Sequence, residues 1–263
     1  MARTTLANVC RLIEASNAEL PIEQEFLADL KRSIEMSNKK NSRKPSPTYK
    51  PSSMNCIRNM WYQVMNTDQD DGITPYTLVG ICDSGSDIHI RIQTAVSLMK
   101  ENDIDCEYID VAEFVKSRGL HNLEIVSQQG METKLYHKAL NMSFLCDGII
   151  RYKGKYYVLE LKSESSNKFW ARKGVDTKHY NQATAYSISF ELDDVIFVYI
   201  SRDSLDMKAY IFTPTDEMKQ ELVGTIDACD GYVQSQTIPP IPENVDKRVC
   251  EFCSYRLRCR ETN

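Results

Sequence analysis

The stretch from Leu145 to Ser163, LCDGIIRYKGKYYVLELKS, constrains the fold of this chain more than any other. Apolar, β-branched and aromatic residues lie on both sides of Lys153-Gly154-Lys155, a pattern that predicts two strands joined by a tight turn. The expected strands also contain Asp147, Glu160 and Lys162. Acidic residues are rare in strands, and a half-buried carboxylate costs free energy, so these three positions indicate a functional site.

The spacing of the three charged residues predicts that their side chains converge. Glu160 and Lys162 are two residues apart, so they lie on one face of a strand, and Asp147 can lie opposite them on its neighbour. Two carboxylates and an ammonium group would then meet at one point. Hard oxygen ligands suit Mg²⁺ or Mn²⁺, and a lysine beside them suits a water molecule that is to be deprotonated.

The size and composition of the chain fit a globular protein. Its 263 residues, 42% hydrophobic and 26% charged, allow one large domain or a core with a small appendage. The sequence contains no membrane-spanning run and no signal-peptide pattern, so we expect a cytoplasmic protein. A net charge of -5 argues against a protein that coats nucleic acid, but it leaves a nuclease open because carboxylates at a metal site lower the net charge.

The first hundred residues are expected to be mostly helical. Apolar spacing over residues 4–37 predicts two helices separated near Pro21. Residues 38–53, rich in Lys, Arg, Pro and Ser, read as a solvated linker or as a basic arm that contacts a phosphate backbone. A helix is expected over 54–65, capped by Ser52 or Ser53, and another over 86–101, just inside which lies His89.

The middle of the chain is expected to alternate strands and helices. Residues 104–140 predict one or two strands and a short helix near Ala112, with Glu132 on a strand as a solvent-facing residue or as an added carboxylate. Residues 164–178 are polar and basic, with Phe169 and Trp170 exposed by pattern; they form either a surface loop or a contact that stacks bases.

The last third predicts helices around a buried strand. A helix over 179–192 places Gln182 and Tyr186 on one face. The apolar run over 195–199 is typical of a strand buried on both faces, with residues 207–212 as its neighbour. A further helix is expected over 215–234, begun by the capping pattern TDEM.

Cysteines near the C-terminus predict a metal or cluster site. Cys250, Cys253 and Cys259 stand as C-x2-C-x5-C, a spacing that lets thiolates converge on one metal or cluster. A fourth ligand is needed, and Cys56 at the start of a helix is our candidate. Spacing alone leaves zinc and an iron-sulfur cluster open. The isolated cysteines are expected to pack in the core; they are Cys82, Cys106, Cys146 and Cys229.

Together these motifs resemble the PD-(D/E)XK nucleases of the RecB-like branch, whose iron-sulfur members include CRISPR-adaptation exonucleases and the nuclease domain of AddB. The resemblance extends from Cys56 to Cys259. Its motifs, in chain order, are Gly85-x-x-x-His89, Asp147, Glu160-Leu161-Lys162, Gln182-x-x-x-Tyr186, and one early cysteine with a late C-x2-C-x5-C. Five motifs in this order make chance a poor explanation.

The resemblance implies a fold, a reaction and site residues. It implies an α/β restriction-endonuclease-like core with a central mixed sheet flanked by helices, spanning 51–263 after an N-terminal helical segment and linker over 1–50. Its implied reaction is hydrolysis of DNA by an exonuclease acting on single strands or ends. Implied ligands of Mg²⁺ or Mn²⁺ are His89, Asp147, Glu160 and the carbonyl of Leu161, with Lys162, Gln182 and Tyr186 as catalytic or positioning residues. A 4Fe-4S cluster would be held by Cys56, Cys250, Cys253 and Cys259.

Other functions remain open from the sequence. The chain could be a nuclease subunit that trims DNA for a recombinase, helicase or CRISPR integrase, in repair, recombination, phage DNA metabolism or CRISPR adaptation. It has no G-x-x-x-x-G-K-[ST] motif, so any ATP-driven unwinding would come from another chain. A non-catalytic DNA-binding adaptor with a zinc or iron-sulfur staple is a second alternative. A zinc-stapled structural protein with a fortuitous E-x-K is a third.

Overall fold

The computed structural model describes residues 21–41, 46–70, 72, 74–243, 245–251 and 253–262. The helix expected before Pro21 lies outside these residues. The chain divides into two compact units, one of residues 1–43 and 72–81 and the other of residues 44–71 and 82–263. The first unit holds helix α2 (Ile22–Asn41) and the beginning of α4 (Tyr76–Ser97). Within it the Glu35 carboxylate accepts a 3.0 Å hydrogen bond from the N–H of Tyr76.

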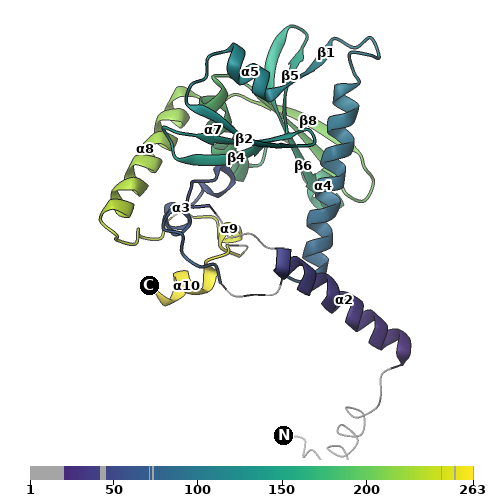
Figure 1. Ribbon diagram of the computed structural model, residues 1–263, viewed down its shortest axis with the longest axis vertical. Coiled ribbons are helices and arrows are strands. Elements are labelled where there is room, and N and C mark those ends of the chain that lie inside the picture. Colours follow the sequence, from purple (N-terminus) through teal and green to yellow (C-terminus); the bar gives the residue numbers. More distant parts are fainter. Residues whose placement is uncertain are drawn as a thin grey trace, which may run out of the picture. The chain divides into compact units, whose positions relative to one another are not determined.

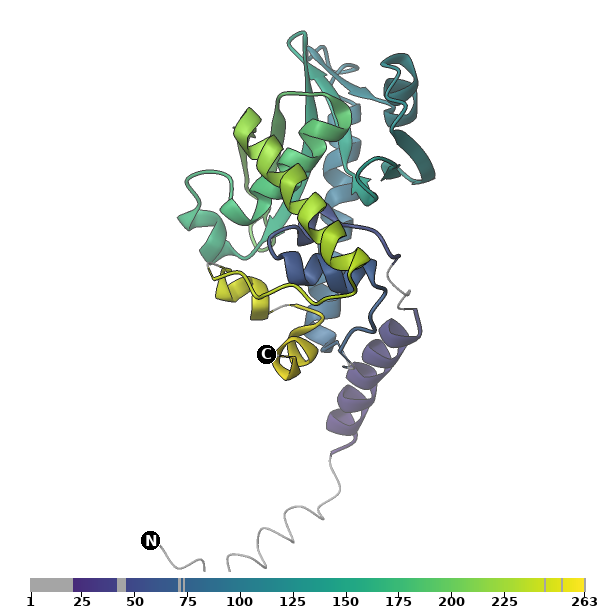
Figure 2. The ribbon, with the colours of Figure 1, turned by 90° about the vertical axis from the view of Figure 1, so that its left-hand side faces the viewer.

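The second unit contains two sheets and the helices packed on them (Figures 1 and 2). Its strands are β1 (Cys106–Ile109), β2 (Leu123–Gln129), β3 (Glu132–His137), β4 (Met142–Cys146), β5 (Gly148–Tyr152), β6 (Lys155–Glu164), β7 (Val195–Ser201) and β8 (Met207–Phe212). Its helices, besides the second part of α4, are η1 (Pro51–Ser53), α3 (Ile57–Val64), α5 (Val111–Ser117), α6 (Ser166–Ala171), η2 (Thr177–His179), α7 (Tyr180–Phe190), α8 (Asp216–Gln234), α9 (Lys247–Glu251) and α10 (Arg256–Glu261).

The larger sheet is mixed, as expected. Its strand order is β1-β5-β6-β7-β8, in which β6 and β7 run parallel and every other pair is antiparallel. A parallel pair needs a crossover connection, and α6, η2 and α7 supply it between β6 and β7. The predicted central mixed sheet flanked by helices is therefore confirmed, as are the buried strand near Val195 and its neighbour β8.

Side chains of β6 alternate between two apolar layers. Leu159 and Leu161 pack in one layer with Ile88 and Ile92 of α4, whereas Val158 packs in the other with residues of α7 such as Ala183. Each fully buried aliphatic side chain of this kind stabilises the fold by about 1.5–3 kcal/mol. Period-two alternation therefore places Glu160 and Lys162 on the α7 face of the sheet.

The expected hairpin joins β5 and β6. Lys153 and Gly154 have φ angles of 49° and 81°, and two central residues with positive φ suit the twist of a two-residue hairpin. Gly148 pairs with Leu159 in the ladder, so Asp147, the preceding residue, lies opposite Glu160. The hairpin and this juxtaposition were both predicted.

Asp147 directly follows the last strand of a second, antiparallel sheet. Strands β2, β3 and β4 form it in sequence order, and Asp147 is the single residue between the end of β4 and the start of β5. This residue therefore lies where the chain passes from one sheet to the other. The short helix expected near Ala112 is α5, whose start is capped by Asp110 accepting from the N–H of Glu113.

Two helix starts differ from the prediction. Helix α4 begins at Tyr76 rather than at residue 86, because Gly80 and Gly85 continue the helix instead of breaking it. At Gly85 an added Cβ would lie 3.2 Å from the Ser163 hydroxyl, so the glycine fits a close approach of α4 to β6. Helix α3 is preceded by Cys56 at its N-cap; the serines proposed as caps belong to the separate turn η1.

The C-terminal segment packs against the start of the second unit. Thr215 caps α8 by accepting from the N–H of Met218, as predicted. Farther on, the Asp70 carboxylate accepts from the N–H groups of Leu257 and Arg258 at the start of α10, at 2.6 and 3.2 Å. Helices α3, α9 and α10 lie side by side in both views (Figures 1 and 2). Among the described helices, none is long and apolar enough to cross a membrane.

Candidate active site

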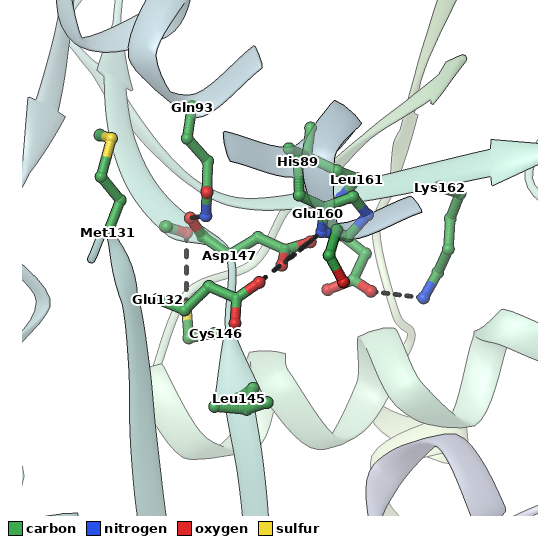
Figure 3. Close-up of polar contacts among 12 residues, drawn as sticks. His89, Gln93, Met131, Glu132, Leu145, Cys146, Asp147, Glu160, Leu161 and Lys162 are labelled. Carbon is green, nitrogen blue, oxygen red and sulfur yellow. Dashed lines mark hydrogen bonds and ion pairs between the residues drawn. The ribbon is translucent and has the colours of Figure 1, made fainter. Parts of the chain in front are cut away.

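Asp147 is the centre of a polar cluster (Figure 3). Its carboxylate accepts a 2.7 Å hydrogen bond from the N–H of Leu161, and its other oxygen lies 3.2 Å from Nδ1 of His89. Its backbone carbonyl accepts from Gln93 at 2.7 Å and from the Tyr108 hydroxyl at 2.8 Å. Three elements, α4, β6 and β1, therefore fix one aspartate.

Glu132 joins this cluster from the second sheet. Its carboxylate lies 3.9 Å from Nδ1 of His89, and one ligand atom each from His89, Glu132 and Asp147 lie within 4.8 Å of one another. Glu132 therefore points toward the cluster, as an added carboxylate rather than as a residue that faces only solvent. An imidazole and two carboxylates form a donor set that fits a divalent cation.

The electrostatics of the cluster also fit a cation. Burial raises the pKa of Glu132, and the neighbouring charge of Asp147 raises it further, while His89 opposes the shift. For His89, burial lowers the pKa, but the hydrogen bond and charge of Asp147 more than offset this, so the pKa is raised overall. Like charges held together in this way are stabilised by a bound positive ion.

Glu160 belongs to a second network on the α7 side. One oxygen of its buried carboxylate accepts from Nζ of Lys162 at 2.5 Å and from the amide of Gln182 at 2.8 Å. The same amide donates to the hydroxyl of Tyr186, which donates to the carbonyl of Leu145 at 3.2 Å. Burial raises the pKa of Glu160, and Lys162 opposes this. The E-x-K and Q-x-x-x-Y residues thus form one hydrogen-bonded chain.

The predicted site residues therefore lie in adjoining networks. His89 and Asp147 share one with Glu132, whereas Glu160 turns its carboxylate toward Lys162. His89 opposes the rise in the pKa of Glu160, and Glu160 raises the pKa of His89. Leu161 contributes its N–H to Asp147; its carbonyl as a metal ligand remains a prediction.

Two residues that hold the backbone carbonyl of Asp147 were not predicted from the sequence. Gln93 is 1% exposed and lies one helical turn after His89, so the i, i+4 spacing on α4 was a usable signal. Tyr108 reaches Asp147 from β1, and an isolated tyrosine in a strand pattern gives no such signal.

The four predicted cluster cysteines lie near one another. Burial raises the pKa of the Cys56 thiol, and the charges of Cys250 and Cys259 raise it further. Burial also raises the pKa of Cys253, to which the other three cysteines add. The segment before α3 and the C-terminal segment thus bring four thiols together. Of the isolated cysteines, Cys106, Cys146 and Cys229 are buried as expected, but Cys82 is exposed.

A cavity of 1190 Å³ adjoins these networks. Residues of segments 50–69, 162–182 and 246–255 line it, including Lys162, Gln182 and Cys253. It thus extends from the E-x-K residues to the cysteine-bearing tail.

The prediction that Phe169 and Trp170 are both exposed is wrong for one of them. Phe169 is buried at 1% exposure, and only Trp170, at 62%, is exposed.

Comparisons with known proteins give weak likenesses. No known protein family and no curated protein matches the sequence. Among solved structures, one titled as the crystal structure of SSO0001 is similar at 16% identity and a TM-score of 0.48, covering 89% of this chain and 96% of that one. An alkaline exonuclease from Laribacter hongkongensis is similar at 9% identity and a TM-score of 0.42, covering 73% and 90%. The same exonuclease in complex with dAMP has a TM-score of 0.39 at 10% identity and the same coverage.

Proposed function

We propose that this chain is a Mg²⁺- or Mn²⁺-dependent deoxyribonuclease of the PD-(D/E)XK type, acting as an exonuclease on single-stranded DNA or DNA ends. One observation carries the proposal: the His89, Glu132 and Asp147 ligand atoms lie within 4.8 Å of one another, beside a buried carboxylate paired with Lys162. A cation-binding donor set next to a lysine suits hydrolysis of a phosphodiester.

The side chains have distinct roles in this proposal. His89, Glu132 and Asp147 would hold the cation through their clustered ligand atoms, and Glu160 and the carbonyl of Leu161 would complete its ligands. When bound, the cation supplies Lewis-acid activation of the phosphate and of the attacking water. Lys162, whose Nζ lies 2.5 Å from the Glu160 carboxylate, is placed to orient that water and to stabilise charge that develops on the phosphate.

Gln182 and Tyr186 are positioning residues. Gln182 donates to the Glu160 oxygen that also accepts from Lys162, and Tyr186 anchors Gln182 to the carbonyl of Leu145. Because Gln182 is held by contacts on both sides, it keeps its rotamer. The Glu160 carboxylate and the Lys162 ammonium group then remain aligned with the DNA strand.

The cysteines are proposed to hold a 4Fe-4S cluster with a structural role. The support is the spacing of one early cysteine, Cys56, with the late C-x2-C-x5-C of Cys250, Cys253 and Cys259, which resembles the cluster-binding pattern of iron-sulfur nucleases. The charges of Cys250 and Cys259 raise the pKa of Cys56, which fits thiols that are close to one another.

The adaptor and partner-dependent alternatives differ in their prediction for the isolated chain. A nuclease that needs a recombinase, helicase or CRISPR integrase would show little activity alone, and an adaptor would show none. The test is to incubate the purified chain with end-labelled single-stranded and duplex DNA in Mg²⁺ or Mn²⁺. We expect metal-dependent shortening of the labelled single strand. If the chain carries its cluster and the DNA stays intact under every condition, the proposal that the isolated chain is a nuclease is contradicted.

A further inference from the structure

The cavity beside Lys162 is lined by groups that bind phosphates. Its volume of 1190 Å³ exceeds the range of about 300–1000 Å³ that is typical of pockets for small molecules. Serine and asparagine side chains are among the lining groups; they are Ser52, Ser53, Asn55 and Asn59. Side chains of these types commonly contact the phosphates and sugars of nucleic acids. The cavity thus fits an extended polar ligand.

Cations exceed carboxylates on the cavity walls. The basic lining residues are Lys50, Lys162, Lys168, Arg172, Lys173 and Lys178, and the acidic ones are Asp176, Asp246 and Glu251. Arg172 is neutralised by the buried Glu164, which accepts from it at 2.7 and 2.5 Å. Within the part of the chain that the structure describes, no carboxylate forms an ion pair with Lys50, Lys168 or Lys173. Lys178 lies 3.8 Å from Asp176, and Lys162 lies 2.5 Å from Glu160. The lining still holds more cations than carboxylates, an excess that would attract a chain of phosphates.

The cations also repel one another. Burial lowers the pKa of Lys178, and the charges of Lys168, Lys162 and Arg172 lower it further, against the opposing effect of Asp176. The nearby His179 is kept neutral in a similar way, because burial and the charges of Lys162, Lys178 and Arg172 lower its pKa to about 2. An anion placed among these groups would relieve the repulsion.

The walls of the cavity are held together before any ligand binds. The side-chain amide of Asn55 donates to the carbonyl of Lys178 at 2.9 Å, and that of Asn181 donates to the carbonyl of Met54 at the same distance. These bonds join the segment before α3 to η2 and to the first turn of α7. A ligand entering such a preformed site loses less affinity to ordering of the protein.

We propose that this cavity binds consecutive phosphates of one DNA strand next to the bond that is cut, through Lys168 and Lys178. The inference rests on the proposed function, since the strand is taken to continue from the site at Lys162. A positive groove that follows the backbone is the usual means of binding a single strand. The volume accommodates a few nucleotides, whereas a duplex, about 34 Å long per helical turn, needs a larger open surface.

The test measures binding without cleavage. Affinity for a labelled single-stranded oligonucleotide is measured without divalent cations at several salt concentrations, for the wild type and for Lys168→Gln/Lys178→Gln. Each phosphate contact on a single strand contributes about 0.7 to the slope of log K against log salt. Two lost contacts should therefore reduce the slope by about 1.4 and weaken binding about 25-fold at 0.1 M salt.

Matched variants separate this role from a change in overall charge. Lys116→Gln/Lys138→Gln removes two exposed lysines that do not line the cavity, and it should bind like the wild type. Lys168→Arg/Lys178→Arg keeps both charges and should retain the salt slope. A Gln variant that unfolds at the wild-type temperature but keeps full affinity and slope would overturn the proposal.

The two proposals fail in different ways. If the wild type binds the single strand through these lysines but never cleaves DNA, only the nuclease proposal fails. If the wild type cleaves DNA while the Gln variant binds normally, only the cavity proposal fails. Blunt duplex bound as tightly as the single strand, with the same loss in the variant, would contradict the assignment to one strand.

Discussion

The ring of Tyr108 occupies the space into which a Cβ atom on Gly148 would project, with an ideal Cβ only 2.6 Å from the nearest ring carbon. From this place the Tyr108 hydroxyl donates to the carbonyl of Asp147, the residue before the glycine. The absence of a side chain at Gly148 thus permits a contact that fixes the central aspartate. Neither residue needs to touch substrate for this to affect the site.

Gly148→Ala should therefore destabilise the protein and disturb Asp147. Overpacking of a fixed ring costs about 1–3 kcal/mol, so urea denaturation should show a loss of this size, and cleavage should slow. Gly224→Ala is the matched control, because nothing lies within 4 Å of an added Cβ inside α8, and the helix should gain about 0.5–1 kcal/mol. Equal stability changes in the two variants would contradict the role of Tyr108.

Glu132→Gln should weaken binding of a divalent cation. The substitution removes a charge 3.9 Å from Nδ1 of His89 while keeping the size of the side chain, and we expect Mn²⁺ affinity to fall on the order of tenfold by calorimetric titration. Glu124→Gln changes an exposed carboxylate on β2 and should leave the affinity unchanged. Unaltered Mn²⁺ binding by the Glu132 variant would exclude this residue from the cation site.

Stability should fall as pH decreases through the ordinary pKa of histidine, in part because of His179. Its folded-state pKa of about 2 lies below the unfolded value of about 6.5, so the unfolded state binds more protons below pH 6.5. This contribution is present above pH 6.5 and is lost on acidification, by at most about 1.4 kcal/mol for each pH unit.

The measurement for His179 is urea denaturation of the wild type and His179→Phe at pH 7 and pH 5. Phenylalanine keeps the stacked ring beside Phe197 but cannot titrate, so the variant should lose less stability between the two pH values. His137, whose pKa burial also lowers, accounts for part of the slope that remains in both proteins. An identical pH dependence in both would show that His179 does not stay neutral in the fold.

Cys253→Ser should lose the bound metal and destabilise the protein. Cys253 lies among the four clustered thiols, and a cofactor held there would join the segment before α3 to the C-terminal helices. Iron and acid-labile sulfide should be present in the wild type and reduced in the variant, while Cys82→Ser, an exposed cysteine of α4, should keep both. One zinc ion per chain and no iron would refute the 4Fe-4S assignment.

The sequence predicted the features that depend on short-range patterns. Alternating apolar residues and a Lys-Gly turn specify the β5–β6 hairpin, and its register alone places Asp147 opposite Glu160. Residue spacing likewise placed Gln182 and Tyr186 on one helix face, where they now share a hydrogen bond. Local patterns suffice here because the interacting groups lie on one helix or on paired strands.

Features that depend on contacts between distant segments were missed. Glu132 faces the site because the small sheet turns toward α4, which no period within β3 reveals. Phe169 is buried although polar residues surround it in the sequence, since Lys208 of β8 covers its ring at 4.7 Å. Gly80 and Gly85 lie within α4 despite their low helix propensity, and at Gly85 the helix approaches Ser163 of β6.

The most direct test of the central claim is the single-turnover rate of cleavage of 5′- and 3′-labelled single-stranded DNA in Mn²⁺, compared between the wild type, Lys162→Ala and Asp147→Asn. Lys134→Ala, a lysine of β3 outside the site network, is the control. We predict metal-dependent cleavage by the wild type and the control, with a loss of at least about 100-fold in both site variants. Wild-type rates in Lys162→Ala and Asp147→Asn, or cleavage that persists without a divalent cation, would contradict the account.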